Sequence, residues 1–182
     1  MGQNIWKDGI IGLMVGDALG VPVEFSSRED REHDPVIGMR AYGTHNQPVG
    51  TWSDDSSMTL ATLDSIKQKG KIDYKDIMDK FTEWCLYADY TPFQEVFDIG
   101  VATSRAIIQY GKGTDPIDCG GKTEWDNGNG SLMRILPVCL YLYNRQKMIC
   151  TSENESIYLI HNVSALTHAH LRSQIACGIY YF

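Results

Sequence analysis

The chain has 182 residues, a formal net charge of −7 and a hydrophobic content of 43%. This length and apolar content suit one compact domain with a sizeable core, so we predict a single domain over residues 1–182. The acidic balance disfavours a nucleic-acid-binding or anionic-membrane surface, because binding to phosphates requires clustered lysine and arginine. A small molecule or another protein is the expected partner.

The cysteines are odd in number and show no Cys-x-x-Cys spacing, which indicates neither a disulfide framework nor a zinc site. They are Cys85, Cys119, Cys139, Cys150 and Cys177. The N-terminus lacks a signal-peptide pattern, and no apolar run approaches membrane-spanning length. We therefore expect a cytoplasmic protein whose thiols are reduced and mostly buried.

The first predicted helix begins near residue 5, where apolar residues recur at helical spacing. Four glycines fall three or four positions apart within it: Gly9, Gly12, Gly16 and Gly20. Each costs a helix about 1 kcal/mol relative to alanine, so we expect another backbone to approach this stripe closely. Asp17 lies in the same apolar segment, and because an unpaired buried charge is costly we expect it to have a partner.

Residues 26–50 are polar and interrupted by proline and glycine, which predicts a loop with at most one short strand. Capping residues and apolar periodicity predict later helices that begin near residues 54, 73, 98, 156 and 167. Segment 118–138 is a glycine- and asparagine-rich loop that runs into a further apolar helix, which Pro137 should kink or shorten. No run of alternating strand residues appears, so the predicted fold class is all-α.

Ser53, Asp54 and Asp55 stand directly before an apolar helical run and allow two interpretations. In the first, Ser53 caps the helix and the acids favour its first turn by about 0.3 to 1 kcal/mol each. In the second, two carboxylates and a hydroxyl supply the oxygen ligands that Mg²⁺ or Mn²⁺ prefers, and the ion removes the repulsion between the acids. The context of this pair has to decide between them.

Two other segments supply that context. Glu24 places a carboxylate just after the glycine-striped helix. The loop at residues 127–130, with sequence NGNG, precedes another helix. Such a loop is either an ordinary tight turn or a set of backbone N–H groups that surround a phosphate.

Taken together, these segments resemble the ADP-ribosylglycohydrolase family, which includes enzymes that remove ADP-ribose from dinitrogenase reductase and other modified proteins. The matching stretches follow the family's order: GLMVGDALGVPVEF (12–25), GTWSDDSSMTLA (50–61), FDIGVATSRAI (97–107), NGNGSLMRILPV (127–138) and THAHLRSQIAC (167–177). They span nearly the whole chain, and five collinear matches are far more specific than any single motif.

The resemblance implies a compact multi-helix domain with a dinuclear Mg²⁺ or Mn²⁺ centre at the bottom of an ADP-ribose cleft. Ser53, Asp54 and Asp55 match the family's metal ligands. Glu24 matches its acidic residue beside the metals and the scissile ribose, as a metal ligand, a general base or both. The expected catalytic residues are thus Glu24, Asp54 and Asp55, and the expected metal site consists of these residues and Ser53.

The same resemblance implies a binding site for the nucleotide. Asn127, Gly128, Asn129 and Gly130 match the loop that holds the diphosphate and the adjoining ribose. His168 matches a histidine that lines the cleft, whereas for His170 we favour an ordinary surface or core role.

The implied activity is metal-dependent hydrolysis of the N- or O-glycosidic bond that links ADP-ribose to a protein side chain or a related ADP-ribosyl compound. Its substrate would be an ADP-ribosylated protein or a small ADP-ribosyl compound. The alternative is a non-catalytic relative that binds ADP-ribose or has a structural role.

The chain departs from the family in one respect. The family completes its metal site with a later Asp-x-Asp motif followed by serine or threonine, and here no two aspartates are two positions apart. We therefore expect an incomplete, C-terminally truncated domain, with a second polypeptide as one way to complete it. With fewer carboxylates, we expect one of the two metals to be lost or bound weakly, which leaves one or none in this chain, and we expect a rate that depends on metal-oriented water to fall steeply.

Overall fold

The computed structural model describes residues 4–148 and 153–182, and in these ranges the chain is helical without any strand. The helices are α1 (Ile5–Gly20), α2 (Arg28–His33), α3 (Asp54–Lys69), α4 (Tyr74–Tyr87), α5 (Val101–Gly111), α6 (Leu136–Met148), α7 (Glu153–Ala165) and α8 (Leu171–Tyr181). Short 3₁₀ turns cover Val21–Val23, Gly43–His45, Pro116–Asp118 and Glu124–Asp126. The prediction of an all-α fold is confirmed.

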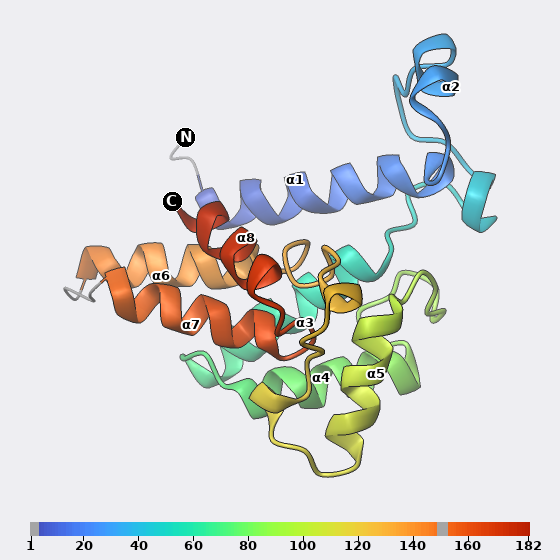
Figure 1. The fold of residues 1–182 in the computed structure, drawn as a ribbon. Coiled ribbons are helices and arrows are strands. Elements are labelled where there is room, and N and C mark those ends of the chain that lie inside the picture. Colours follow the sequence, from blue (N-terminus) through green and yellow to red (C-terminus); the bar gives the residue numbers. More distant parts are fainter. Residues whose placement is uncertain (1–3, 149–152) are drawn as a thin grey trace.

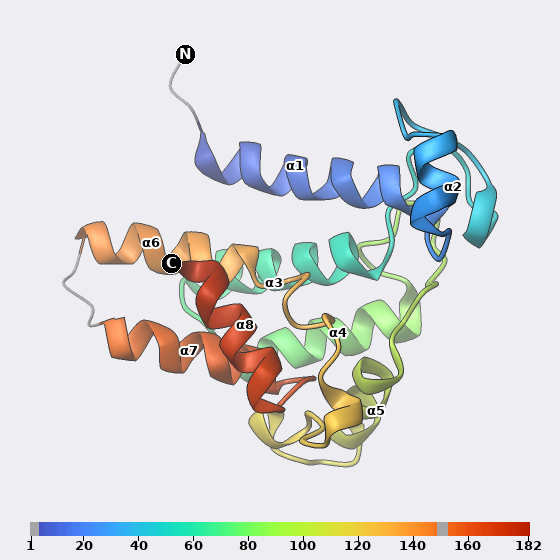
Figure 2. The ribbon, with the colours of Figure 1, turned by 45° about the horizontal axis from the view of Figure 1, so that its top comes forward.

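Helix α3 lies at the centre of the structure and packs against α1, α4 and α6 (Figures 1 and 2). Helix α1 runs along one side of the molecule. Helix α2 lies beyond the C-terminal end of α1, apart from the other helices. No helix in the described part of the chain combines the length and apolarity needed to cross a membrane.

The main hydrophobic core forms where α3, α4, α6 and α7 meet. Its fully buried members include Met58, Ile77, Phe81, Trp84, Leu142 and Ile160. In α4 the apolar residues Ile77, Met78, Phe81 and Trp84 pack inward. Four cysteines are free thiols, with Cys119, Cys139 and Cys177 buried and Cys85 half-buried, while Cys150 lies outside the described residues.

Helix boundaries follow the local capping signals. Ser53 caps α3, and Gly70 ends it in the left-handed conformation with φ +67°, as a C-terminal glycine often does. Helix α5 begins at Val101, three residues later than predicted, because Asp98 has φ +58° and the chain becomes helical only after Gly100. Pro137 does not kink α6: it lies in the first turn of the helix, where a missing N–H leaves no bond unmade.

The predicted start of the last helix was also wrong. Helix α8 begins at Leu171, and residues 167–170 form the turn that joins it to α7. His170 accepts a hydrogen bond from the backbone N–H of Arg172 and so caps α8.

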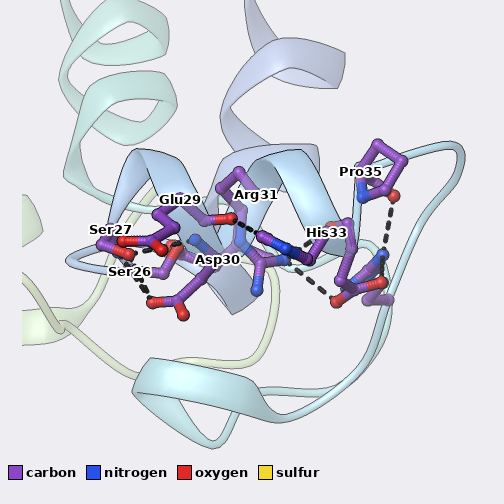
Figure 3. Close-up of polar contacts among 10 residues, drawn as sticks. Ser26, Ser27, Glu29, Asp30, Arg31, His33 and Pro35 are labelled. Carbon is purple, nitrogen blue, oxygen red and sulfur yellow. Dashed lines mark hydrogen bonds and ion pairs between the residues drawn. The ribbon is translucent and has the colours of Figure 1, made fainter.

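The predicted loop at residues 26–50 contains helix α2 and no strand, only an isolated bridge between Tyr42 and Gln47. Ser27 and Asp30 form a capping box that starts α2, as Figure 3 shows. The Asp34 carboxylate then accepts hydrogen bonds from Arg31 and Arg40. The Ser-x-x-Asp spacing was the sequence signal for this short helix.

The expected close approach of a backbone to the glycine stripe of α1 was wrong. A Cβ atom at Gly12, Gly16 or Gly20 would meet nothing within 4 Å in the described part of the chain. Close approach occurs instead at Gly120, where a Cβ atom would lie 2.2 Å from the carbonyl oxygen of Ala165. This contact joins the segment before the NGNG loop to the turn after α7.

We therefore predict that Gly12→Ala and Gly16→Ala each raise the free energy of unfolding of this chain by about 0.5 to 1 kcal/mol, because alanine restricts the unfolded chain and suits a helix. Gly120→Ala should lower it, because the new methyl group has no space. Urea denaturation followed by circular dichroism measures all three changes. A loss of stability in Gly12→Ala would mean that this face of α1 is covered.

Candidate active site

A pocket of about 350 Å³ forms where residues from all five family-like stretches meet. Its polar and glycine lining includes Glu24, Asp54, Asp55, Asp98, Gly128, Asn129, Gly130 and His168. The N-terminus of α3 supplies the acidic pair, and the turn between α7 and α8 supplies the histidine. Asn127, which was also expected in the site, does not line the pocket but directly precedes the loop residues that do. Ser53 lines an adjoining hollow with Asp17, Glu24 and Asp55.

Asp17 of α1 attaches to the N-terminus of α3. Its carboxylate accepts hydrogen bonds from the backbone N–H and the hydroxyl of Ser53, at 3.0 and 2.8 Å. It also accepts from the N–H and the hydroxyl of Ser56, at 3.0 and 2.6 Å. The expected partner of Asp17 is thus the first turn of α3, whose free N–H groups favour a negative charge.

The carboxyl groups of Asp54 and Asp55 face the pocket. Asp54 is only 5% exposed. Burial, followed by the charges of Asp55, Asp98 and Asp17, raises its pKa to about 8. Burial, followed by the charge of Asp17, raises the pKa of Asp55 to about 6. A role limited to helix capping would not require this burial, since acids in a first turn act equally well from the surface.

Glu24 lines the same pocket and is held by a histidine that the sequence analysis missed. The Nε2 atom of His45 lies 2.7 Å from Oε2 of Glu24 and 4.0 Å from Oδ1 of Asp98. Burial raises the pKa of Glu24, an effect that the His45 hydrogen bond opposes and the Asp98 charge reinforces. The His45 ring packs between Phe25 and Phe97, with centroid distances of 5.9 and 5.2 Å.

Asp98 is the second residue that sequence analysis missed as part of the site. It lies in the family-like stretch at residues 97–107, but it was interpreted as the start of a helix. His45 had no comparable signal, because it lies in a polar segment without a motif.

The donor set of this pocket fits a divalent cation. Ligand atoms of Glu24, His45 and Asp98 lie within 4.8 Å of one another. In the described ranges no lysine or arginine forms an ion pair with Asp54 or Asp55. Carboxylate oxygens are the ligands that Mg²⁺ and Mn²⁺ prefer, and their mutual repulsion here lacks a compensating cation from the protein.

The other wall of the pocket carries hydrogen-bond donors. The backbone N–H groups of Gly128, Asn129 and Gly130 have no hydrogen-bond partner within the described chain. The buried His168 ring lies against this loop: a Cβ atom at Gly130 would be 2.6 Å from its Cε1 atom, so only glycine fits there. Burial and the charge of Arg134 lower the pKa of His168 to about 4, so its ring is neutral.

The fold and the pocket together define an all-helical protein with a site suited to a cation and an anionic ligand. The sequence profile of ADP-ribosylglycohydrolase matches residues 6–182. The chain belongs to the ADP-ribosylglycohydrolase family.

Two curated relatives and one solved structure are similar over most of the chain. It is 32% identical to the ADP-ribosylarginine hydrolase Tri1 of Pseudomonas putida (strain GB-1) over 165 residues, which cover 89% of this chain and 41% of the relative. It is 33% identical to the ADP-ribosyl-dinitrogen reductase glycohydrolase of Rhodospirillum rubrum, with coverage of 71% and 42%. A solved structure titled ADP-ribosylglycohydrolase-related protein complex has a TM-score of 0.72 and 32% identity, with coverage of 94% and 52%.

The chain therefore spans about two fifths of the length of these curated relatives, at 41% and 42%. That a further polypeptide completes the site stays a prediction.

The raised carboxyl pKa values predict how stability depends on pH. The folded chain holds protons on Asp54 and Asp55 that the unfolded chain releases above about pH 4, so this stability is full at low pH and is lost as the pH rises through 6 and 8. In the presence of a chelator, Asp54→Asn should raise the free energy of unfolding by about 1 to 3 kcal/mol at about pH 8.5 and change it little at about pH 5. The matched control is Asp8→Asn, because Asp8 is an exposed aspartate on α1. A destabilised Asp54→Asn protein at about pH 8.5 would contradict the account of repulsion.

Proposed function

We propose that the pocket binds the ADP-ribosyl group and that its acidic wall hydrolyses the glycosidic bond linking ADP-ribose to a protein side chain, with arginine as the first acceptor to test. The observation that carries this proposal is the convergence of five distant segments on one pocket. The two relatives are named for activities on ADP-ribosylarginine and on ADP-ribosyl-dinitrogen reductase, which supports the choice of bond and acceptor.

Ser53, Asp54, Asp55 and Glu24 are the residues that would hold Mg²⁺ or Mn²⁺, with Asp98 beside them. A divalent ion bound there supplies positive charge that offsets the carboxylates and polarises oxygen atoms near the ribose. The Ser53 hydroxyl donates to Asp17 at 2.8 Å, and this bond leaves an oxygen lone pair available.

Glu24 is the proposed general base. The hydrogen bond from His45 holds one of its carboxylate oxygens in place, and partial burial brings its pKa upward toward that of a useful proton acceptor. Glu24 would take a proton from the water that attacks the anomeric carbon, while the bond from that carbon to the acceptor nitrogen breaks. The bonding electron pair would leave with the guanidine, which would then take up the proton from Glu24. Because the transition state of glycoside hydrolysis has positive charge on the sugar, the neighbouring carboxylates of Asp55 and Asp98 would also stabilise it.

The NGNG loop at residues 127–130 would hold the diphosphate. The free N–H groups of Gly128, Asn129 and Gly130 line the pocket, where they can donate to phosphate oxygens. The buried His168 closes this side. A pocket lined both by carboxylates and by free backbone donors suits a ligand with an anionic diphosphate at one end and a reacting sugar at the other.

The proposal predicts that Asp55→Ala lowers release of ADP-ribose from ADP-ribosyl-arginine by about 100-fold or more, because the lost carboxylate stabilises charge at the reacting sugar. Release is measured with Mg²⁺ and with Mn²⁺, and Asp8→Ala is the matched control. Unchanged release in Asp55→Ala refutes the assignment. Calorimetric binding of ADP-ribose without any release by the parent chain would instead support the non-catalytic alternative.

A second prediction concerns the cation alone. Mn²⁺ should raise the thermal unfolding midpoint of the parent chain more at about pH 8 than at about pH 5, since protons compete with the metal for the carboxylates. Asp54→Asn should lose most of this shift, and Asp8→Asn should keep it. An equal shift in all three proteins would place the bound cation elsewhere.

A further inference from the structure

The backbone of His168 is held on both sides. The N–H of His168 donates to the carbonyl oxygen of Ser164 at 2.8 Å. The Ser164 hydroxyl donates in turn to the carbonyl oxygen of His168 at 2.9 Å. The next residue, Ala169, donates its N–H to the carbonyl oxygen of Gly121 at 2.9 Å. The ring is therefore placed at the pocket wall by the turn between α7 and α8, and the residue is only 4% exposed.

The inward nitrogen of the ring contacts a hydroxyl that is itself held by an arginine. Oγ1 of Thr167 lies 2.8 Å from Nδ1 of His168. Nη2 of Arg134 donates to the same Oγ1 atom at 2.8 Å and to the carbonyl oxygen of Val163 at 3.2 Å. Guanidinium nitrogens only donate, so Thr167 must accept from Arg134 and has its own proton left to donate.

That proton has one acceptor within the described chain, Nδ1 of His168. In the opposite arrangement His168 would donate from Nδ1, and the hydroxyl proton of Thr167 would have no acceptor in a site where this residue is 0% exposed. An unmade hydrogen bond in such a site is costly. Nδ1 is therefore the acceptor, and the single ring proton is on Nε2.

The charged form of the imidazole is excluded by its surroundings. Arg134 is completely buried, and burial lowers its pKa only to about 10, so it stays cationic. Its charge and the burial of the ring disfavour a second proton on His168, and the charge of Asp126 opposes them less strongly.

The outward nitrogen faces the NGNG loop. A Cβ atom at Gly130 would lie 3.2 Å from Nε2 of His168, and one at Gly128 would lie 3.7 Å away. Nε2 itself has no hydrogen-bond partner among the described residues. His168 lines the pocket, so a donor without a partner at Nε2 is suited to an oxygen atom of a ligand.

We propose that Thr167, held by Arg134, is a positioning residue that fixes His168 as the Nε2–H tautomer, so that the pocket presents an N–H donor to a phosphate oxygen or a ribose hydroxyl. Only the identity of the ligand rests on the proposed function. The tautomer itself follows from contacts within the chain.

The test observes the tautomer directly, without ligand. Two-bond ¹H–¹⁵N spectra of the ¹⁵N-labelled chain at about pH 7 distinguish a protonated from an unprotonated ring nitrogen. The His168 signals are identified by their loss in His168→Gln. We expect an unprotonated Nδ1 and a protonated Nε2. An Nδ1–H tautomer or a doubly protonated ring in the parent chain overturns the inference.

Variants then test the part played by Thr167. Thr167→Val removes the hydroxyl, so we expect a mixture of tautomers and about tenfold weaker binding of ADP-ribose by calorimetry. Thr167→Ser keeps the hydroxyl and should retain both the tautomer and the affinity. The matched control is Thr62→Val, which removes a buried hydroxyl in α3 that donates to the carbonyl oxygen of Met58 at 2.8 Å. Thr62 does not line the pocket, so this change should alter neither the tautomer nor the affinity for ADP-ribose.

Each failure has a distinct signature. If Thr167→Val keeps the Nε2–H tautomer, or fails to fold while Thr167→Ser loses it, the positioning role is wrong. If the parent chain has the Nε2–H tautomer but does not bind ADP-ribose, the proposed function fails and the tautomer stands.

Discussion

Repulsion among carboxylates at the N-terminus of α3 is the constraint on which the site depends. Asp17, Glu24, Asp54, Asp55 and Asp98 all surround this helix end. Asp17 is stabilised by the N–H groups and hydroxyls of the first turn, and Glu24 by His45. Among the described residues Asp54 and Asp55 have no cationic partner, and burial together with the neighbouring carboxylates raises their pKa values.

This arrangement also explains how α1 and α3 are joined. A carboxylate from one helix that caps another makes the position of α1 dependent on the same helix end that positions the acidic pair. A change that moves α1 would therefore also change the geometry of the pocket. The glycine stripe, by contrast, contributes no contact to this junction in the described chain.

The carboxylates and the neutral donors of the pocket are held in place by different interactions. The fold brings the carboxylates of Asp54, Asp55 and Asp98 together, and their repulsion would be offset by a bound cation. The neutral donors are fixed in direction: the NGNG backbone by its turn, and His168 by the chain of hydrogen bonds from Arg134 through Thr167. Burial strengthens both effects, since a low local dielectric raises the cost of unpaired charge and of an unmade hydrogen bond alike.

The sequence alone determined the helical class, the start of α3 at its Ser53 cap, and the five stretches that supply the pocket. These features depend on apolar periodicity, capping residues and short motifs, which act within a few residues. The tertiary structure alone decided that His45 would reach Glu24 and that Asp98 would line the pocket. It also decided that Gly12, Gly16 and Gly20 of α1 would have open space beside them in the described chain. Such contacts depend on the path of loops with left-handed residues, such as Phe25 at φ +59° and Asp98 at φ +58°, and a path of this kind is set by long-range packing that no local pattern encodes.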